Sequence, residues 1–208
     1  MEIELKYKIN DKFRMKEIME DEDLAKIEEK GSLEEISMKA AYFDTEDDIL
    51  SKNDIAFRVR MEGARIVATL KWDDSNCGGL YTREEINVPI NSTVCFLNPD
   101  PAIFKESEMG KDLLTLLNGK PLRSILEMRF LRKRRRIDTG KAICELSLDE
   151  GVILTDYGNL PISEMEIELY SGDKSEMLQF GKKIADKYGL EPELESKYAR
   201  GLKMIKGF

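Results

Sequence analysis

Carboxylate and ammonium groups alternate with apolar side chains at the start of the chain. Glu2, Glu4 and Lys6 would share one face of an extended segment, because successive side chains of a strand point to opposite sides. A second acidic run lies late in the chain and consists of Glu164, Glu166 and Glu168. Paired carboxylates suit hard cations such as Mg²⁺ or Mn²⁺, which prefer oxygen ligands. If the two segments meet, they predict a divalent metal site.

Cationic side chains follow the same alternation elsewhere. Arg58 and Arg60 share one face of a segment, and Lys71, Arg83 and Glu85 occupy comparable positions in the next two. Arginine binds phosphate oxygens bidentately, whereas lysine acts as a point charge. These residues predict an anionic ligand that carries phosphate.

The absence of histidine narrows the possible chemistry. It excludes Ser-His and Cys-His nucleophile pairs, a histidine general base and His-ligated zinc. The sequence also has no P-loop and no G-x-G-x-x-G motif. Catalysis would therefore depend on carboxylates, Lys, Arg, Tyr or a hard metal ion.

Short alternating runs dominate the chain and predict strands over residues 2–8, 55–61, 65–72, 81–89, 128–137, 142–149 and 164–170. Helical patterns predict helices from Asp11 to about residue 30, and over residues 101–118, 174–188 and 194–205, with capping signals at the first and third. Gly78-Gly79 is typical of a hairpin turn. One face of each strand is apolar and the other densely charged. A solvated outer side would explain a single such strand. The whole set favours a closed barrel with the charges inside.

Three further segments bear on this interior. On a strand, the run from Arg132 to Arg136 places Arg132 and Arg134 on the inward face and leaves Lys133 and Arg135 on a solvated face. Asp149 precedes the late acidic run on the neighbouring strand. Lys197, in Ser196-Lys197-Tyr198-x-Arg200, lies either on a solvated helix face or on a helix that lends it to the interior.

Bulk properties limit the surroundings of the protein. The 208 residues include 36% charged side chains and carry a net charge of −8, which disfavours indiscriminate binding to nucleic acids or membranes. No apolar stretch approaches the ~18 residues of a membrane span, and the first residues lack the pattern of a signal peptide. Cys77, Cys95 and Cys144 are expected to be free thiols. We therefore expect one cytoplasmic domain over residues 1–208, with a homodimer only as the default assumption.

Taken in order, the motifs resemble the CYTH superfamily, the triphosphate tunnel metalloenzymes. They are Glu2-x-Glu4-x-Lys6, Tyr42-Phe43-Asp44-Thr45, Arg58-x-Arg60, Thr69-Leu70-Lys71, Arg83-x-Glu85, Leu148-Asp149-Glu150-Gly151, Glu164-Met165-Glu166-Ile167-Glu168-Leu169 and Ser196-Lys197-Tyr198-x-Arg200-Gly201. The resemblance implies an α+β fold, in which helices pack outside a closed eight-stranded antiparallel β-barrel. The overall spacing is more similar to the bacterial triphosphatase branch than to the shorter cyclase branch.

The resemblance also implies roles for particular residues. The metal ligands, for Mg²⁺ or Mn²⁺, would be Glu2, Glu4, Glu164, Glu166 and Asp149. The triphosphate would be bound by Lys6, Arg58, Arg60, Lys71, Arg83, Arg132, Arg134 and Lys197. The catalytic groups would be Glu85, Glu166 and Lys6, with the carboxylates orienting the attacking water. Whether Glu164 or Glu168 completes the late acidic pair stays open.

The function implied is metal-dependent hydrolysis of a small-molecule substrate, inorganic triphosphate or a related organic triphosphate. The alternatives are a class IV-type adenylyl cyclase that makes cyclic AMP from ATP, release of the RNA 5′-terminal phosphate, and a non-catalytic binder of polyphosphate or nucleotides. Hydrolysis is favoured because both acidic pairs are intact and no residue cluster indicates an adenine pocket. The acidic net charge argues against RNA as a partner.

Overall fold

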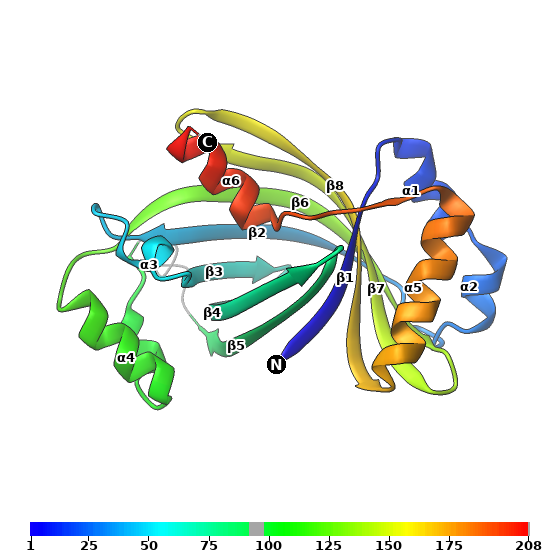
Figure 1. The fold of residues 1–208 in the computed structure, drawn as a ribbon, viewed down its shortest axis with the longest axis horizontal. Coiled ribbons are helices and arrows are strands. Elements are labelled where there is room, and N and C mark those ends of the chain that lie inside the picture. The colour runs from blue at the N-terminus through cyan, green and yellow to red at the C-terminus, as the bar shows by residue number, and fades with distance from the viewer. Residues whose placement is uncertain (92–97, 208) are drawn as a thin grey trace.

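The computed structural model describes residues 1–91 and 98–207, and the strands of this part of the chain close into an antiparallel β-barrel (Figure 1). Going around the barrel, the eight described strands follow the order β1-β5-β4-β3-β2-β6-β7-β8, and β8 pairs again with β1. Their bounds are β1 Glu2–Lys8, β2 Glu34–Asp44, β3 Ala56–Glu62, β4 Arg65–Cys77, β5 Leu80–Ile90, β6 Arg123–Asp138, β7 Ala142–Thr155 and β8 Gly158–Gly172. A two-residue strand, β9 (Glu191–Pro192), pairs with β1 beyond the end of β5. The predicted eight-stranded barrel is confirmed.

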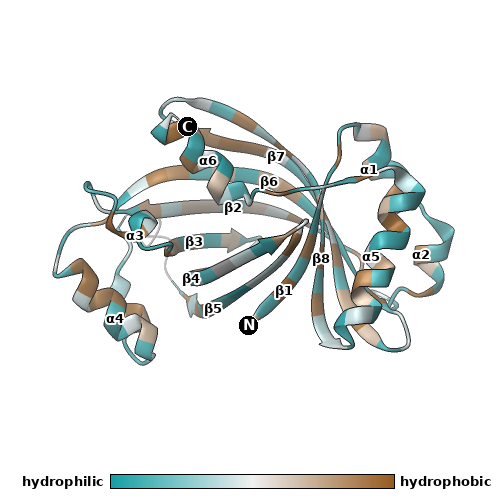
Figure 2. Ribbon diagram, in the orientation of Figure 1, coloured by the Kyte–Doolittle hydropathy of each residue, from teal (hydrophilic) through white to brown (hydrophobic). Residues whose placement is uncertain are grey.

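The strands form because their side chains alternate between two environments. In Figure 2, hydrophilic and hydrophobic residues alternate along the barrel strands, which is the period-two pattern of a sheet with two different faces. The predicted hairpin at Gly78-Gly79 joins β4 to β5. Both glycines have positive φ, 60° and 87°, as a tight two-residue hairpin turn requires.

Five described α-helices pack on the outside of the barrel (Figure 1). Helices α1 (Lys12–Met19), α2 (Glu22–Lys26) and α5 (Lys174–Tyr188) cover an apolar core on the outer faces of β1, β7 and β8. Helices α3 (Ile49–Lys52) and α4 (Glu108–Leu117) cover a second core on β2 to β5. In the described part of the chain, no helix is both long and apolar enough to cross a membrane.

The sixth helix, α6 (Lys197–Lys206), packs against the inward face of the barrel. Its Gly201 lies so close to β6 and β7 that an added Cβ would come 2.6 Å from Leu126 Cδ2 and 3.2 Å from Ile153 Cγ2. The ring of Tyr198 stacks on Tyr42 of β2, with centroids 4.8 Å apart. A small residue at position 201 and a stacked ring at position 198 therefore seat α6 inside the curve of the sheet.

Two of the predicted helices are each divided by an internal cap. The prediction of one helix from Asp11 to about residue 30 was wrong, because the Asp21 side chain accepts hydrogen bonds from the backbone N–H groups of Asp23 and Leu24 and starts a new helix. In the 101–118 region, a 3₁₀ helix over Pro101–Phe104 precedes α4. The Ser107 side chain caps α4 by accepting from Gly110 N at 3.0 Å.

Strand β2 was not predicted, because both of its faces are apolar in its second half. Ala40 and Tyr42 point inward, Ala41 and Phe43 point outward, and all four are buried. A strand buried on both sides has no polar alternation to reveal it. Among the cysteines, Cys77 and Cys144 are free thiols as expected, whereas Cys95 lies outside the described residues.

Candidate active site

A cavity of about 1000 Å³ lies inside the barrel and is lined mainly by the inward faces of its strands. The predicted site residues that line it are Glu2, Glu4, Lys6, Arg58, Arg60, Lys71, Arg83, Glu85, Arg132, Arg134, Glu166 and Lys197. Glu168 lines it as well, but Glu164 and Asp149, which are fully buried, do not. The late carboxylates that face the cavity are therefore Glu166 and Glu168.

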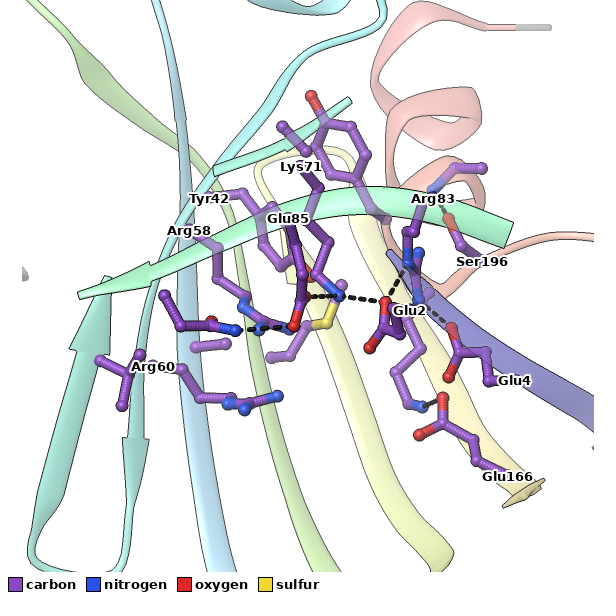
Figure 3. A pocket seen from close by; sticks show the side chains of 18 of the residues that line it. Glu2, Glu4, Tyr42, Arg58, Arg60, Lys71, Arg83, Glu85, Glu166 and Ser196 are labelled. Atoms are coloured by element: carbon purple, nitrogen blue, oxygen red, sulfur yellow. Dashed lines mark hydrogen bonds and ion pairs between the residues drawn. The ribbon is translucent and has the colours of Figure 1, made fainter. Parts of the chain in front are cut away.

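The first strand brings its two carboxylates beside cations from β4 and β5 (Figure 3). Arg83 donates hydrogen bonds to both Glu2 and Glu4. Lys71 Nζ lies 2.8 Å from Glu2 Oε2 and 2.7 Å from Glu85 Oε2. Burial alone would raise the pKa of Glu2, but Lys71 and Arg83 together hold it well below its usual value. The Glu2 carboxylate is thus ionised at neutral pH.

Lys6 connects the two acidic strands. Its Nζ lies 3.0 Å from Glu4 Oε1 and 2.5 Å from Glu166 Oε1, across the pairing of β1 with β8. Burial would lower the pKa of Lys6, but Glu166 and Glu164 raise it above its usual value. The ammonium therefore stays charged and fixes the spacing of the two carboxylate runs.

Glu166 also belongs to a buried cluster of three acidic groups. Asp149, Glu164 and Glu166 each offer an oxygen within 4.8 Å of the others, as a metal site would require. The Lys197 ammonium is bound by all three, at 2.8 Å from Asp149 Oδ2 and 2.9 Å from Glu166 Oε1. On the other side, Arg132 binds Asp149 through two hydrogen bonds of 2.7 Å. Cations of the chain itself thus surround this cluster.

The opposite wall of the cavity carries excess positive charge. Arg58 and Arg60 come from β3, and Arg58 Nη2 donates to Thr69 Oγ1 at 3.1 Å. Among the described residues, neither Arg58 Nε nor Arg60 Nε finds an acceptor, although both atoms are buried. Burial and the neighbouring Arg58 lower the pKa of Arg60 to about 10, even though Arg60 also pairs with Glu62. Buried donors without acceptors are costly, so this wall is suited to an anion.

Excess negative charge gathers around Glu168. Burial and the nearby carboxylates of Glu2 and Glu145 raise the pKa of Glu168 to about 7. Glu168 makes no ion pair with any residue that the structure describes. The cavity therefore has a cationic pole at Arg58 and Arg60 and an anionic pole at Glu2 and Glu168.

The arginine run on β6 divides between the faces only in part as predicted. Arg132 and Arg134 point into the cavity, and Lys133 is exposed and pairs with Glu35 at 3.2 Å. The assignment of Arg135 to a solvated face was wrong. Its side chain is only 2% exposed, lies beneath α1 and α2, and binds Glu28 and the carbonyl oxygen of Met19. It anchors the helices that cover the outer face.

Two further residues contact the site: Glu145, which matches the family pattern less securely, and Arg200, which was not predicted as functional. Glu145 accepts from Tyr170 Oη at 3.1 Å and from Arg134 at 3.3 Å, and Arg134 also pairs with Glu34. Arg200 binds Glu164, three residues after Lys197 on the same face of α6. That spacing in Ser196-Lys197-Tyr198-x-Arg200 is the signal that could have indicated both cations together.

The comparisons with known proteins agree with this geometry. The sequence profile of the CYTH domain matches residues 1–202. An inorganic triphosphatase of Haemophilus influenzae is 27% identical over 165 residues, which cover 77% of this chain but 44% of the relative. The chain thus spans less than half the length of that relative.

Two solved structures share the fold. A Hippeastrum protein, an adenylyl cyclase candidate with a dominant triphosphatase activity, is 19% identical, with a TM-score of 0.74 over 100% of this chain and 96% of its own. A Bacillus halodurans protein described as an adenylate cyclase candidate is 21% identical, with a TM-score of 0.61 over 96% of each chain. At these identities the similarity establishes the fold.

Proposed function

The chain belongs to the CYTH domain family, and from this premise we propose that it is a divalent-metal-dependent hydrolase of inorganic triphosphate or a related organic triphosphate. The bond cleaved is the terminal phosphoanhydride. The named activity of the Haemophilus influenzae relative supports this reaction.

One observation carries the proposal: the two poles of excess charge within one cavity. The cationic pole has buried guanidinium donors that lack acceptors, and the anionic pole has a carboxylate whose pKa is raised to about 7. A triphosphate that carries a divalent cation complements both poles at once, because its phosphate oxygens bind the arginines and its metal offsets the carboxylates.

The carboxylates of the anionic pole, together with Glu4 and Glu166 beside them, fit a divalent cation by their chemistry. Glu2, Glu4, Glu166 and Glu168 are oxygen donors on neighbouring strands, and all four face the cavity. Mg²⁺ and Mn²⁺ prefer carboxylate oxygens, and such an ion, when bound, supplies charge neutralisation at the phosphate oxygens. We propose these four carboxylates as its ligands.

The cations of the chain bind and orient the substrate. Arg58, Arg60 and Arg132 hold phosphate oxygens, and Lys71 and Arg83 approach from β4 and β5. Their charge stabilises the oxygens as the bridging P–O bond lengthens. Lys6 contributes by holding Glu4 and Glu166 at a fixed spacing.

The carboxylates orient the nucleophile. We propose that Glu85 or Glu166 accepts a hydrogen bond from the attacking water and aligns it with the terminal phosphorus. The new O–P bond forms as the bridging bond breaks, and the leaving diphosphate takes the electron pair. Asn87 Nδ2 donates to Glu85 Oε1 at 2.6 Å and restrains that carboxylate.

The test measures orthophosphate released from inorganic triphosphate and from ATP with Mg²⁺ or Mn²⁺, together with cyclic AMP. Glu4→Gln is expected to lose at least about 100-fold in rate, because it removes a charge at the reacting centre. Glu35→Gln is the matched control, since Glu35 lies on the outer face of β2 and pairs with Lys133.

Each outcome decides between the functions. Orthophosphate release that Glu4→Gln loses and Glu35→Gln keeps would support the hydrolase. Cyclic AMP and diphosphate from ATP would replace it with a cyclase. Tight triphosphate binding without turnover would leave a binding protein.

A further inference from the structure

Lys197 occupies the centre of the acidic cluster formed by Asp149, Glu164 and Glu166. Its side chain enters from the first turn of α6, where Ser196 caps the helix by accepting from Ala199 N at 3.1 Å. All three carboxylates bind its ammonium, and the Lys197 residue is only 8% exposed. The ring of Phe130 closes another side, with its centroid 5.5 Å from Nζ.

The dimensions of this cluster are those of a small cation site. A divalent ion bound at about 2.1 Å by octahedral ligands holds their oxygens roughly 3 to 4.2 Å apart. The carboxylate oxygens lie within 4.8 Å of one another, so they would need to contract only slightly around such an ion. An ammonium at 2.8 to 2.9 Å from Asp149 and Glu166 takes that central place instead.

The charges of the cluster are already compensated without a metal. Three further cations surround the carboxylates: Arg132 on Asp149 and Glu166, Lys6 on Glu166, and Arg200 on Glu164. The contrast is Glu168, which makes no ion pair with any described residue.

We propose that Lys197 is a tethered cation that excludes divalent metal from the Asp149–Glu164–Glu166 cluster and thereby positions the N-terminal end of α6. The cluster then acts as the socket for α6, and metal ions are confined to the carboxylates that face the cavity. The packing of Gly201 on Leu126 and Ile153 delivers the lysine to this socket. Lys197 is a positioning residue in this role.

Removing the ammonium should convert the socket into a metal site. Lys197→Met keeps an unbranched side chain of nearly the same length but removes the ammonium, so three buried carboxylates have less compensation. Breaking a buried ion pair from one side is strongly destabilising, because the remaining charge has no partner. A divalent ion can replace the lost charge, so the variant should bind one more ion than the unchanged protein.

The experiment counts bound Mn²⁺ in the full chain by electron paramagnetic resonance of the free ion, without any phosphate ligand. Lys197→Met is expected to gain one Mn²⁺ per chain. The double variant Lys197→Met with Glu164→Gln is expected to lose that extra ion. Arg200→Met is the matched control: it removes a neighbouring cation of the same helix from Glu164, but leaves the centre of the cluster filled, and should gain none.

An unchanged Mn²⁺ count in folded Lys197→Met would overturn the proposal. If that variant does not fold alone, Mn²⁺ should restore its thermal unfolding transition and fail to restore that of the double variant, and absence of rescue would overturn it equally. The functional meaning of this inference rests on the proposed metal dependence of the enzyme, but its test does not. Metal counting needs no turnover, so a failure here leaves the hydrolase assignment to be judged by phosphate release.

Discussion

The inward face of the barrel has two sections of opposite character on the same strands. On β7, Asp149 belongs to the charged cluster and Ile153 to an apolar section beneath α6. On β6, Met128 belongs to the apolar section, whereas Arg132 belongs to the charged one. Four residues along a strand thus separate a surface that binds charge from one that binds a helix.

The difference shows how the two tasks of the interior are divided. Buried ion pairs add little net stability, because desolvation offsets much of their attraction. Apolar burial is the dominant favourable term in folding. The apolar section therefore holds α6 and sets the position of Lys197. The charged section can carry Arg60, whose pairing with Glu62 does not offset its burial, and Glu168, which makes no ion pair with a described residue. Activity and stability should consequently respond to different substitutions.

The largest expected effect is at the cationic pole. Arg60→Met should lower kcat/KM for inorganic triphosphate by about 100- to 1000-fold, because one preorganised donor to the phosphates is lost. Its stability should stay equal or rise, since the lowered pKa of Arg60 shows that its charge is unfavourable in the folded state. Steady-state kinetics and thermal unfolding measure the two. Arg129→Met, on the exposed outer face of β6, is the control, and a parallel loss of activity and stability would contradict the division.

The apolar section should show the reverse behaviour. Ile153→Ala removes a fully buried side chain beneath α6 and should cost about 2–4 kcal/mol in free energy of unfolding. Activity below the unfolding transition should change by only a few fold. Urea unfolding and phosphate release measure both, and Ile143→Ala, 38% exposed on the same strand, should cost far less. If Ile153→Ala lost turnover without losing stability, this section would belong to the chemistry.

The same division explains how much the sequence revealed. Alternating charges on β1, β3, β5 and β6 predicted the closed barrel and most of the charged side chains that line the cavity. The predicted strands stopped at residue 149 and resumed at residue 164, although β7 and β8 continue through this gap. There Ile153 and Ile162 face α6, and the inward face no longer contrasts with the outward one. Alternation along a sequence reveals a strand when one face is charged and the other apolar. It gives no signal where the inward face is apolar too, because a helix packs against it.

The anionic pole should give stability a pH dependence of its own. The pKa of Glu168 is raised from 4.5 to about 7, so the folded protein keeps a proton that the unfolded chain has lost. The associated stability is present below pH 4.5 and is lost as the pH rises through 7. Without divalent metal, Glu168→Gln should therefore gain about 1–3 kcal/mol relative to the unchanged protein between pH 5 and pH 8. Urea unfolding at the two pH values measures this gain. If the variant and the unchanged protein differed by the same free energy of unfolding at both, Glu168 would not carry an uncompensated charge.

The smallest expected effects are at Tyr198 and Tyr42, the two stacked rings that join α6 to β2. The Tyr198 hydroxyl is buried, and no described residue bonds to it, so Tyr198→Phe should raise the free energy of unfolding by about 1 kcal/mol. The stacking on Tyr42 is kept, because the ring is unchanged. Tyr42→Phe is the matched control: its hydroxyl interacts with the Arg58 guanidinium, so its loss should lower stability instead. Urea unfolding measures both changes in the free energy of unfolding. Changes of opposite sign would place the boundary between the charged and apolar sections at this pair of rings. Changes of the same sign would show that the boundary lies elsewhere.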